Sequence, residues 1–277
     1  MSRTIAEKRA AFRALHASGC FVLPNPWDVG SARYLSSLGF RALATTSSGF
    51  AWTRGCADNQ VDRAIILAHL REMVAATELP INADFENGFA SDAAGVHESV
   101  RLAVEAGVAG LSIEDSTGKQ THPQFPLEEA VARLAAARRA IDEAGGDTLL
   151  IGRAENFLFA QPSLDDTIAR LQAYAEVGAD CLYAPGLKTR EQIAAVVSAV
   201  APKPVNVLVG SSSDLTLQEL ASLGVRRISV GGGLARAAWG GFMRAAQRLS
   251  EGRFDGFEGN ASGAQLNALF GDRADAG

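Results

Sequence analysis

The sequence predicts a single α/β domain that folds as a (β/α)8 barrel of the TIM type. Eight short, nearly all-apolar segments alternate with eight longer segments that carry apolar residues at helical spacing. This alternation is typical of a parallel sheet covered by helices. No shift in composition divides the 277 residues into separate parts. Eight strand-and-helix units in about 250 residues match a closed barrel.

An open, doubly wound sheet is the alternative fold. Such a sheet normally has a glycine-rich dinucleotide-binding turn after its first strand. Here the corresponding turn is Pro24-Asn25-Pro26-Trp27, which contains no glycine. This difference favours the barrel.

The elements follow in order along the chain. We expect a helix over residues 4–17, the barrel over about 21–250, and a tail over 251–277 that forms a short helix against a neighbour. Apolar segments predict strands at 21–25, 41–46, 80–86, 110–114, 148–153, 180–184, 205–209 and 227–230. Helical spacing predicts helices at 28–38, 61–77, 93–106, 127–144, 164–177, 189–200, 214–223 and 234–249. Asp28 and Asp214 are the expected N-caps of two of them, and residues 52–59 are expected to form a loop.

Composition limits the class of partner. The formal net charge is −5, and the charges are mixed along the chain without a Lys/Arg cluster, which argues against a nucleic-acid partner. No apolar run approaches the roughly 18–20 residues of a membrane span, and residues 1–16 lack the apolar core of a signal peptide. The three cysteines are scattered and odd in number, so no disulfide framework is expected. We therefore expect a cytoplasmic protein without nucleic-acid or membrane partners.

Carboxylates gather at the ends of two predicted neighbouring strands. Asp84 and Glu86 end the third strand, and alternate residues of a strand point to the same side. Glu114 and Asp115 end the fourth, and Asp58 is available from a loop. Adjacent carboxylates repel one another unless a cation or a shared proton lies between them. The alternative for each pair is an ordinary acidic strand end that caps the next helix.

The two pairs together favour a metal site. In a barrel, active sites form at the carboxyl ends of the strands, which is where these side chains lie. Several carboxylates with water form a hard oxygen site that suits Mg²⁺ or Mn²⁺. None of the four histidines lies at a strand end, so zinc is not favoured. The candidate metal ligands are the carboxylates of these two pairs, and Asp58, Glu114 and Arg153 are candidate catalytic residues.

Two further elements suggest that the substrate is an anion. Arg153 ends the fifth strand, where its planar guanidinium suits a carboxylate or phosphonate. The turn of Thr46, Ser47 and Ser48 before Gly49 offers hydroxyl and backbone N–H groups. Arg153 could instead be a structural ion-pair partner of a nearby glutamate, and the turn could be an ordinary polar loop. A cation beside two anion-binding elements predicts a small 2-oxo acid whose enolate is stabilised by a Lewis acid.

At this point several motifs match a known group of enzymes. The sequence resembles the isocitrate lyase/phosphoenolpyruvate mutase superfamily from about Phe21 to Leu249. The order and spacing of the motifs carry the resemblance. They are Gly39-Phe40-Arg41-Ala42-Leu43, Gly55-Cys56-Ala57-Asp58, Asp84-Phe85-Glu86-Asn87-Gly88-Phe89, Gly110-Leu111-Ser112-Ile113-Glu114-Asp115, Gly152-Arg153-Ala154-Glu155-Asn156-Phe157 and Gly178-Ala179-Asp180.

The resemblance implies a barrel whose last helix is exchanged between subunits of a homodimer or homotetramer. It implies Mg²⁺ held by Asp84, Glu86 and Glu114, mostly through water, with Asp58 nearby. It also implies that residues 46–48 and Arg153 bind the substrate anion. In addition, Asn206 matches a substrate-binding asparagine of the lyase branch. Enzymes of the superfamily cleave or form C–C or P–C bonds next to a 2-oxo acid.

Departures from the family's patterns narrow the expected reaction. The lyases have a Lys-Lys-Cys-Gly-His loop after the fourth strand, whereas residues 116–122 read Ser-Thr-Gly-Lys-Gln-Thr-His. After the sixth strand, Tyr183-Ala184-Pro185 replaces the acid/base histidine or glutamate of other members. The chain therefore resembles the phosphonomutase-like branch without the lyase loop. We expect a C–C lyase of the oxaloacetate decarboxylase type, acting on a small 2-oxo acid or a 2-hydroxy di- or tricarboxylate.

Two alternatives remain open from the sequence. The first is a mutase or hydrolase that acts on the P–C bond of phosphonopyruvate. The second is a non-catalytic barrel that binds 2-oxo acids.

Overall fold

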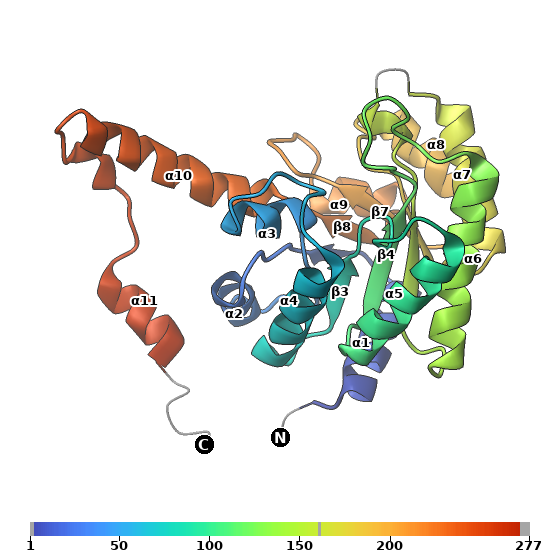
Figure 1. Cartoon of the computed structure of the whole chain (residues 1–277). Helices are drawn as coiled ribbons and strands as arrows, with labels where there is room; N and C mark the ends of the chain where they lie inside the picture. Colours follow the sequence, from blue (N-terminus) through green and yellow to red (C-terminus); the bar gives the residue numbers. More distant parts are fainter. Residues whose placement is uncertain (1–2, 160–161, 272–277) are drawn as a thin grey trace.

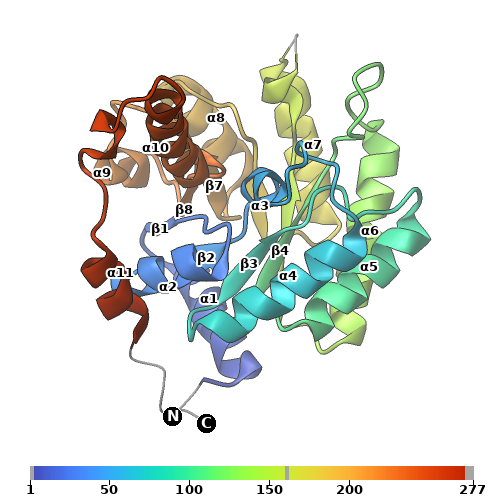
Figure 2. The same cartoon turned by 60° about the vertical axis from the view of Figure 1, so that its left-hand side comes forward.

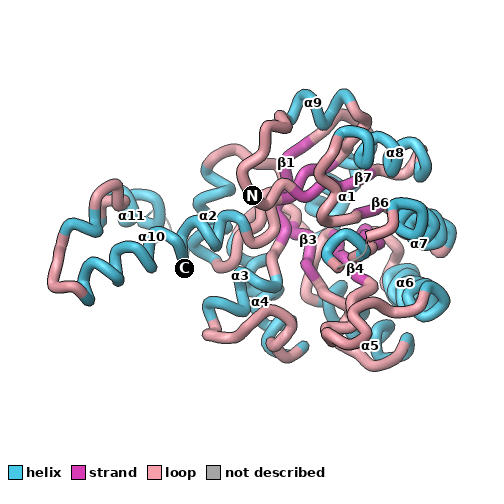
Figure 3. Tube along the Cα trace, turned by 90° about the horizontal axis from the view of Figure 1, so that it is seen from above, coloured by secondary structure: helices cyan, strands magenta, loops and turns pink. Residues whose placement is uncertain are grey.

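Eight parallel strands form the centre of the molecule. The computed structural model describes residues 3–159 and 162–271. The strands are hydrogen-bonded in the order β1-β8-β7-β6-β5-β4-β3-β2. A further hydrogen bond, from the Ala44 N–H to the Pro24 carbonyl at 3.0 Å, joins β2 to the end of β1. The sheet thus curls into the predicted barrel, which Figure 3 shows from one end with helices around it. The strands are β1 (Phe21–Leu23), β2 (Leu43–Ala44), β3 (Ile81–Asp84), β4 (Gly110–Glu114), β5 (Leu149–Arg153), β6 (Cys181–Tyr183), β7 (Val205–Leu208) and β8 (Arg227–Ser229).

The predicted helices are present and alternate with the strands. Several of them begin at a capping side chain. Asp28, for example, is the predicted N-cap of α2, and its side chain accepts a hydrogen bond from the Ser31 N–H at 2.7 Å. The helices are α1 (Ile5–Ala17), α2 (Val29–Ser37), α3 (Ser47–Thr53), α4 (Arg63–Ala76), α5 (Ala93–Glu105), α6 (Leu127–Glu143), α7 (Leu164–Glu176), α8 (Arg190–Val200), α9 (Leu217–Ser222), α10 (Gly233–Ser250) and α11 (Gly263–Phe270). Two short 3₁₀ turns lie at Asn156–Leu158 and Asp255–Phe257.

Helix α1 closes the amino-terminal end of the barrel. Phe12 is fully buried and belongs to an inner cluster with apolar side chains of five strands. A Cβ atom added at Gly110 of β4 would lie 2.7 Å from the Phe12 ring, so only glycine allows this close approach. The floor of the barrel is therefore packed, and any site must open at the other end.

Three local predictions were wrong. The polar stretch after β2 begins with the seven-residue helix α3, because the Thr46 hydroxyl accepts a hydrogen bond from the Gly49 N–H and starts a helical turn. Helix α9 is capped by Thr216, two residues after the expected Asp214. Strand β3 ends at Asp84, and Glu86 has a positive φ of 45°, so strand alternation does not place these two carboxylates.

The carboxyl-terminal arm, α10 and α11, extends away from the barrel (Figures 1 and 2). Only Ala235 of α10 is buried, whereas Trp239, Phe242 and Met243 are exposed. The tail does form the predicted short helix, α11, and it contacts α2 of its own chain. The exchange of the last helix between subunits stays a prediction. Within residues 3–159 and 162–271, no helix combines the length and the apolar character needed to cross a bilayer.

Candidate active site at the carboxyl ends of the strands

A small cavity lies at the predicted catalytic end of the barrel. It holds about 160 Å³, and its wall includes side chains from the strand ends, from the start of α3 and from the loop before α4. Six of the predicted site residues line it: Thr46, Ser47, Ser48, Asp58, Asp84 and Arg153. The fold therefore brings six of the predicted site residues to one cavity, while their roles stay predictions.

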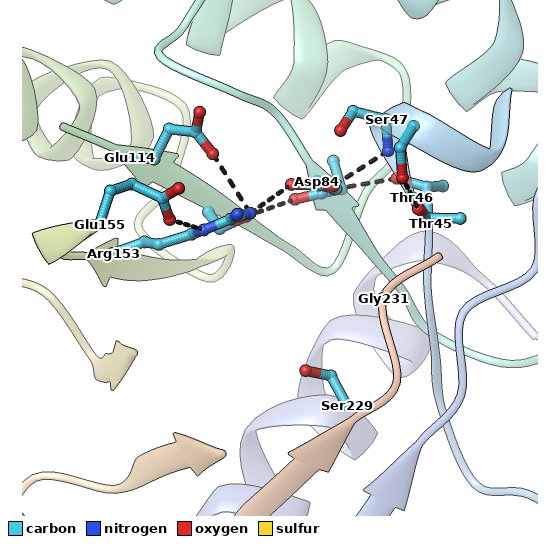
Figure 4. A network of polar contacts seen from close by, with 12 residues as sticks. Thr45, Thr46, Ser47, Asp84, Glu114, Arg153, Glu155, Ser229 and Gly231 are labelled. Carbon is cyan, nitrogen blue, oxygen red and sulfur yellow. Dashed lines mark hydrogen bonds and ion pairs between the residues drawn. The ribbon is translucent and has the colours of Figure 1, made fainter. Parts of the chain in front are cut away.

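Asp84 is held from two sides. Its Oδ2 atom accepts a hydrogen bond from the Ser47 N–H at 2.9 Å, and its Oδ1 atom lies 3.1 Å from Nη1 of Arg153 (Figure 4). The Asp84 N–H donates to the Thr45 hydroxyl at 2.9 Å. The predicted hydroxyl-rich turn thus positions a carboxylate through the first N–H of α3. Its hydroxyl groups at Thr46, Ser47 and Ser48 also line the cavity.

Arg153 links the carboxylates of Asp84 on β3 and Glu114 on β4 to that of Glu155, which follows β5. Its Nη1 atom lies 3.2 Å from Glu114 as well as 3.1 Å from Asp84, and its Nε atom donates to Glu155 at 2.5 Å. The guanidinium also lies over the Tyr183 ring, 5.1 Å from the ring centre. The structural ion-pair role considered for Arg153 is therefore present. The same side chain also lines the cavity, so its position is fixed by protein groups before a ligand arrives.

Glu86 and Glu114 are buried beside this centre. The Glu86 carbonyl accepts a hydrogen bond from the Glu114 N–H at 2.9 Å, which ties the two backbones together. Burial, and then the negative charges of Asp84 and Asp58, raise the pKa of Glu86 to about 8. Burial also raises the pKa of Glu114 well above its usual value, although Arg153 acts in the opposite direction. Both carboxyl groups are thus poised to hold a proton or to neutralise a cation.

Asp58 completes the carboxylate cluster, by which we mean Asp58, Asp84, Glu86 and Glu114. The residue lies on an exposed loop, but its carboxylate lines the cavity. Partial desolvation there, and then the charge of Asp84, raise the pKa of Asp58. Asp58 thus lines the cavity next to solvent, and its affinity for a proton is increased.

Asp115, the neighbour of Glu114, has a structural role instead. It is almost fully buried and accepts hydrogen bonds from Tyr174, Arg170 and Gln124 at 2.6, 3.1 and 3.0 Å. The Glu155 N–H donates to its other oxygen at 2.9 Å. Asp115 therefore fixes the loop that carries Glu155, which in turn holds Arg153.

Asn206 lies deeper than expected for a ligand contact. It is fully buried, its amide donates to the Ser229 hydroxyl at 2.9 Å, and its oxygen accepts from Nε of Arg227 at 2.8 Å. It is not part of the cavity wall, whereas Arg227 and Ser229 are. Its role as a substrate-binding residue stays a prediction that this arrangement does not favour.

Several wall residues were not found by sequence reasoning. They include the side chains of Asn25, Asn82, Ser112, Tyr183, Arg227 and Ser229. The available signal was the presence of polar residues inside otherwise apolar strands, because a polar residue there must point at a polar interior or be satisfied by a partner. Gly231 and Gly232 also line the cavity. Next to them, Gly233 packs closely on Gly210, because a Cβ atom added at Gly233 would lie 3.0 Å from the Gly210 carbonyl oxygen.

The residues present fit a divalent cation. The cluster supplies four hard carboxylate donors, and no hydrogen bond to the Glu86 carboxylate is found within residues 3–159 and 162–271. Across the same residues, no three His, Cys, Asp or Glu side chains are grouped so that they could hold a metal ion. The expectation that Asp84, Glu86 and Glu114 would hold Mg²⁺, mostly through water, stays a prediction.

The sequence matches the phosphoenolpyruvate phosphomutase family over residues 12–250, which include every residue of this site. The chain belongs to the phosphoenolpyruvate phosphomutase family. The family falls in the superfamily that the motifs resemble, whose enzymes are C–C lyases or mutases.

Three relatives place the chain within this family. A solved structure from Burkholderia cenocepacia J2315, named a "putative lyase/mutase", is 48% identical with a TM-score of 0.93, and the match covers 97% of this chain and 98% of that one. Oxaloacetate decarboxylase from Rhodopseudomonas palustris (strain BisA53) is 34% identical over 76% of this chain and 73% of its own. A structure of phosphonopyruvate hydrolase with oxalate and Mg²⁺ is 26% identical with a TM-score of 0.84, over 98% of this chain and 96% of that one.

Proposed function

We propose that this family member is a Mg²⁺- or Mn²⁺-dependent C–C lyase that acts on a small 2-oxo acid and catalyses an oxaloacetate-like decarboxylation. The observation that carries the proposal is the composition of the cavity, which holds only about 160 Å³ and is lined by Asp58, Asp84 and Arg153. Drug-sized ligands need pockets of about 300 Å³ or more, so this site suits an acid of a few carbon atoms. The similarity to oxaloacetate decarboxylases supports this choice.

The roles of the residues follow from their positions. Arg153 and the groups at Ser47 and Ser48 bind and orient the substrate carboxylate. Asp84, Glu86 and Glu114 would hold the cation, which would polarise the 2-oxo group and stabilise negative charge on its oxygen. Asp58 carries the proton that the carbon atom takes up after bond cleavage, because it faces the cavity and has a raised pKa.

The absence of the lyase Cys loop fits this assignment. Residues 116–126 form an irregular loop in which Ser116 pairs with Gln124 and the Thr117 N–H donates to the Pro123 carbonyl at 2.9 Å. Decarboxylation needs an electron sink and one proton donor, and it does not need a separate acid on this loop. His122 of the loop is exposed and does not line the cavity.

Purified protein tests the proposal directly. With Mg²⁺ we expect turnover of oxaloacetate or of malate-type and 2-methylmalate-type acids, and loss of turnover with a chelator. No turnover of the whole panel would contradict the lyase assignment. Stabilisation of the protein by 2-oxo acids without turnover would then indicate the non-catalytic binder.

The similarity to phosphonopyruvate hydrolase supports a second candidate, P–C bond cleavage or transfer. The carboxylate and the 2-oxo group would be held in the same way. Incubation with phosphonopyruvate, followed by phosphorus NMR, separates the two candidates. Release of phosphate or formation of a phosphate ester would favour the second.

We also propose that the protein forms a homodimer or homotetramer through α10. Among the exposed apolar side chains of the arm are Trp239, Phe242, Met243 and Phe254, of which Phe242 and Phe254 are 63% and 77% exposed. An apolar face of this kind is typical of a surface that a partner covers. A second copy that donates the same arm would cover it with closed symmetry.

A further inference from the structure

Arg227 is a buried cation at the bottom of the active-site cavity. It is 2% exposed, and yet it forms part of the cavity wall. It is the first residue of β8, and its Nη1 atom lies 3.5 Å from Nε2 of His16 on the helix that closes the barrel. The cavity therefore extends from the carboxylate cluster at the strand ends down to a guanidinium near the barrel floor.

The partners of Arg227 are all uncharged. Nε donates to the Asn206 side-chain oxygen at 2.8 Å and Nη1 to that of Asn82 at 3.3 Å. Burial and the nearby charge of Arg227 lower the pKa of His16 to about 3, so that ring stays neutral. No hydrogen bond from Nη2 is found within residues 3–159 and 162–271, and no carboxylate of these residues forms an ion pair with Arg227.

Other buried arginines of the protein have different surroundings from Arg227. Arg153 and Arg170 have carboxylate partners at 2.5 to 3.2 Å. Arg133 has no ion pair, and within residues 3–159 and 162–271 its Nε and Nη1 atoms have no hydrogen-bond partner. Its Nη2 atom donates to two backbone carbonyls, its guanidinium lies over the Phe125 ring, and it is not part of the cavity wall. Arg227 differs from all three because it both lines the cavity and has a guanidinium nitrogen, Nη2, for which no hydrogen bond is found among the described residues. A buried charge without a counter-ion is costly, so such a group marks a place for a bound anion.

The wall around Arg227 suits a carboxylate. Ser112, Ser229 and Asn82 line the same part of the barrel interior and supply neutral polar groups without negative charge. The acids of the cluster lie at the carboxyl end of the barrel, where Arg153 pairs with Asp84 and Glu114 and the predicted cation would supply further positive charge. The cavity thus has two separate cationic centres at different depths.

We propose that Arg227 forms a second anion subsite at the cavity floor, which binds the substrate carboxylate remote from the 2-oxo group. This inference rests on the proposed function and deepens it, because it assigns the substrate to the 2-oxo dicarboxylates. In the proposed decarboxylation the carboxylate at Arg227 leaves as CO2, and the electron pair of the broken C–C bond passes to the 2-oxo group. Arg227 is thereby a specificity-determining residue. A monocarboxylic 2-oxo acid would leave its guanidinium without a counter-ion and would bind more weakly.

Binding by calorimetry in the presence of Mg²⁺ tests the subsite. The probes are 3,3-difluorooxaloacetate, which has the remote carboxylate, and oxalate, which has no chain beyond the chelating group. Arg227→Gln should weaken binding of the first by about tenfold or more and leave oxalate within about twofold, since a hydrogen bond to a charged group contributes about 1.5–3 kcal/mol. The matched control is Arg226→Gln, because Arg226 is the next residue, bonds to the Gly19 carbonyl and is not part of the cavity wall.

A measurement on the wild type alone tests the subsite even if the Arg227→Gln variant does not fold. The wild type should bind 3,3-difluorooxaloacetate at least about tenfold more tightly than 2-oxobutanoate, the four-carbon 2-oxo acid without the remote carboxylate. Equal affinities would overturn the subsite, as would an Arg227→Gln variant that binds both probes like the wild type or loses both equally. If the wild type bound none of the three acids, the proposed function itself would fail, which is a distinguishable result.

Discussion

The Nη1 atom of Arg153, at the end of β5, lies 3.1 Å from the Oδ1 atom of Asp84, at the end of β3. This ion pair crosses β4, whose last residue, Glu114, shares the same nitrogen at 3.2 Å. One guanidinium therefore neutralises part of a site that holds several more carboxylates. Because a metal ion would supply the remaining positive charge, the properties of the site should depend strongly on divalent cations.

Asp84→Asn should remove cation-dependent ligand binding. The neutral amide keeps the size of the side chain but removes the charge that faces both Ser47 and Arg153. We expect the affinity for oxalate with Mg²⁺ to fall by at least about tenfold, as measured by calorimetry. Asp62→Asn, on an exposed residue before α4, is the control. Unchanged oxalate binding in Asp84→Asn would count against the metal assignment.

The stability of the metal-free protein should depend on pH through Glu86. Its pKa is about 8 in the folded state and near 4.5 in the unfolded chain, so the folded state holds a proton that the unfolded state has lost between these values. The free energy of unfolding should therefore fall as the pH rises from about 4.5 to 8, by up to about 1.4 kcal/mol per pH unit from this group.

Urea unfolding of the wild type and of Glu86→Gln, with a chelator present, measures this contribution. The difference in stability between them should shift in favour of the variant as the pH rises towards 8 and then become constant. Parallel pH profiles for the two proteins would show that Glu86 ionises normally. Mg²⁺ binding to the wild type at pH 7 should also release protons.

Arg153→Gln should destabilise the metal-free protein. Removal of one partner from a buried set of ion pairs leaves Glu155 and Glu114 uncompensated, with an expected cost of about 3–5 kcal/mol. Mg²⁺ should restore part of this stability, because it supplies positive charge to the same carboxylates. Thermal unfolding with and without Mg²⁺ gives both values, and a variant as stable as the wild type without metal would argue against the charge balance described here.

Phe12→Ala should affect stability without affecting the site. Phe12 is fully buried between α1 and the inner face of the barrel, so its removal leaves a cavity and should cost about 3–5 kcal/mol. The cavity of the active site opens at the other end of the strands. At a temperature where the variant is folded, its affinity for oxalate should therefore equal that of the wild type.

Phe242→Glu should weaken assembly. The side chain is 63% exposed on the outer part of α10, far from the cavity wall, so the charge costs little in the isolated chain. In an oligomer that covers this face, the same charge would be buried. Light scattering after size exclusion should show a smaller species for the variant. Identical masses for variant and wild type would contradict an α10-mediated assembly.

Local patterns in the sequence were sufficient for the barrel and for much of its catalytic end. Apolar periodicity located all eight strands, and helix caps such as Asp28 were readable because a capping bond forms within one turn. Asp84, Glu114 and Arg153 were predictable as site residues because each ends a strand, and parallel strands end at the same face. The resemblance to the family then assigned these residues to a predicted metal site and a predicted anion site.

Which way a particular side chain points was decided only by the tertiary structure. Glu114 and Asp115 are neighbours in sequence, but one faces Arg153 and the other is enclosed by Tyr174 and Arg170. Arg226 and Arg227 cannot be distinguished by composition, yet only the second reaches the cavity. The physical reason is that the direction of a side chain depends on its place in the alternation along its strand, on the stagger between neighbouring strands and on where the strand ends. These depend on hydrogen bonds to strands that are distant in the sequence.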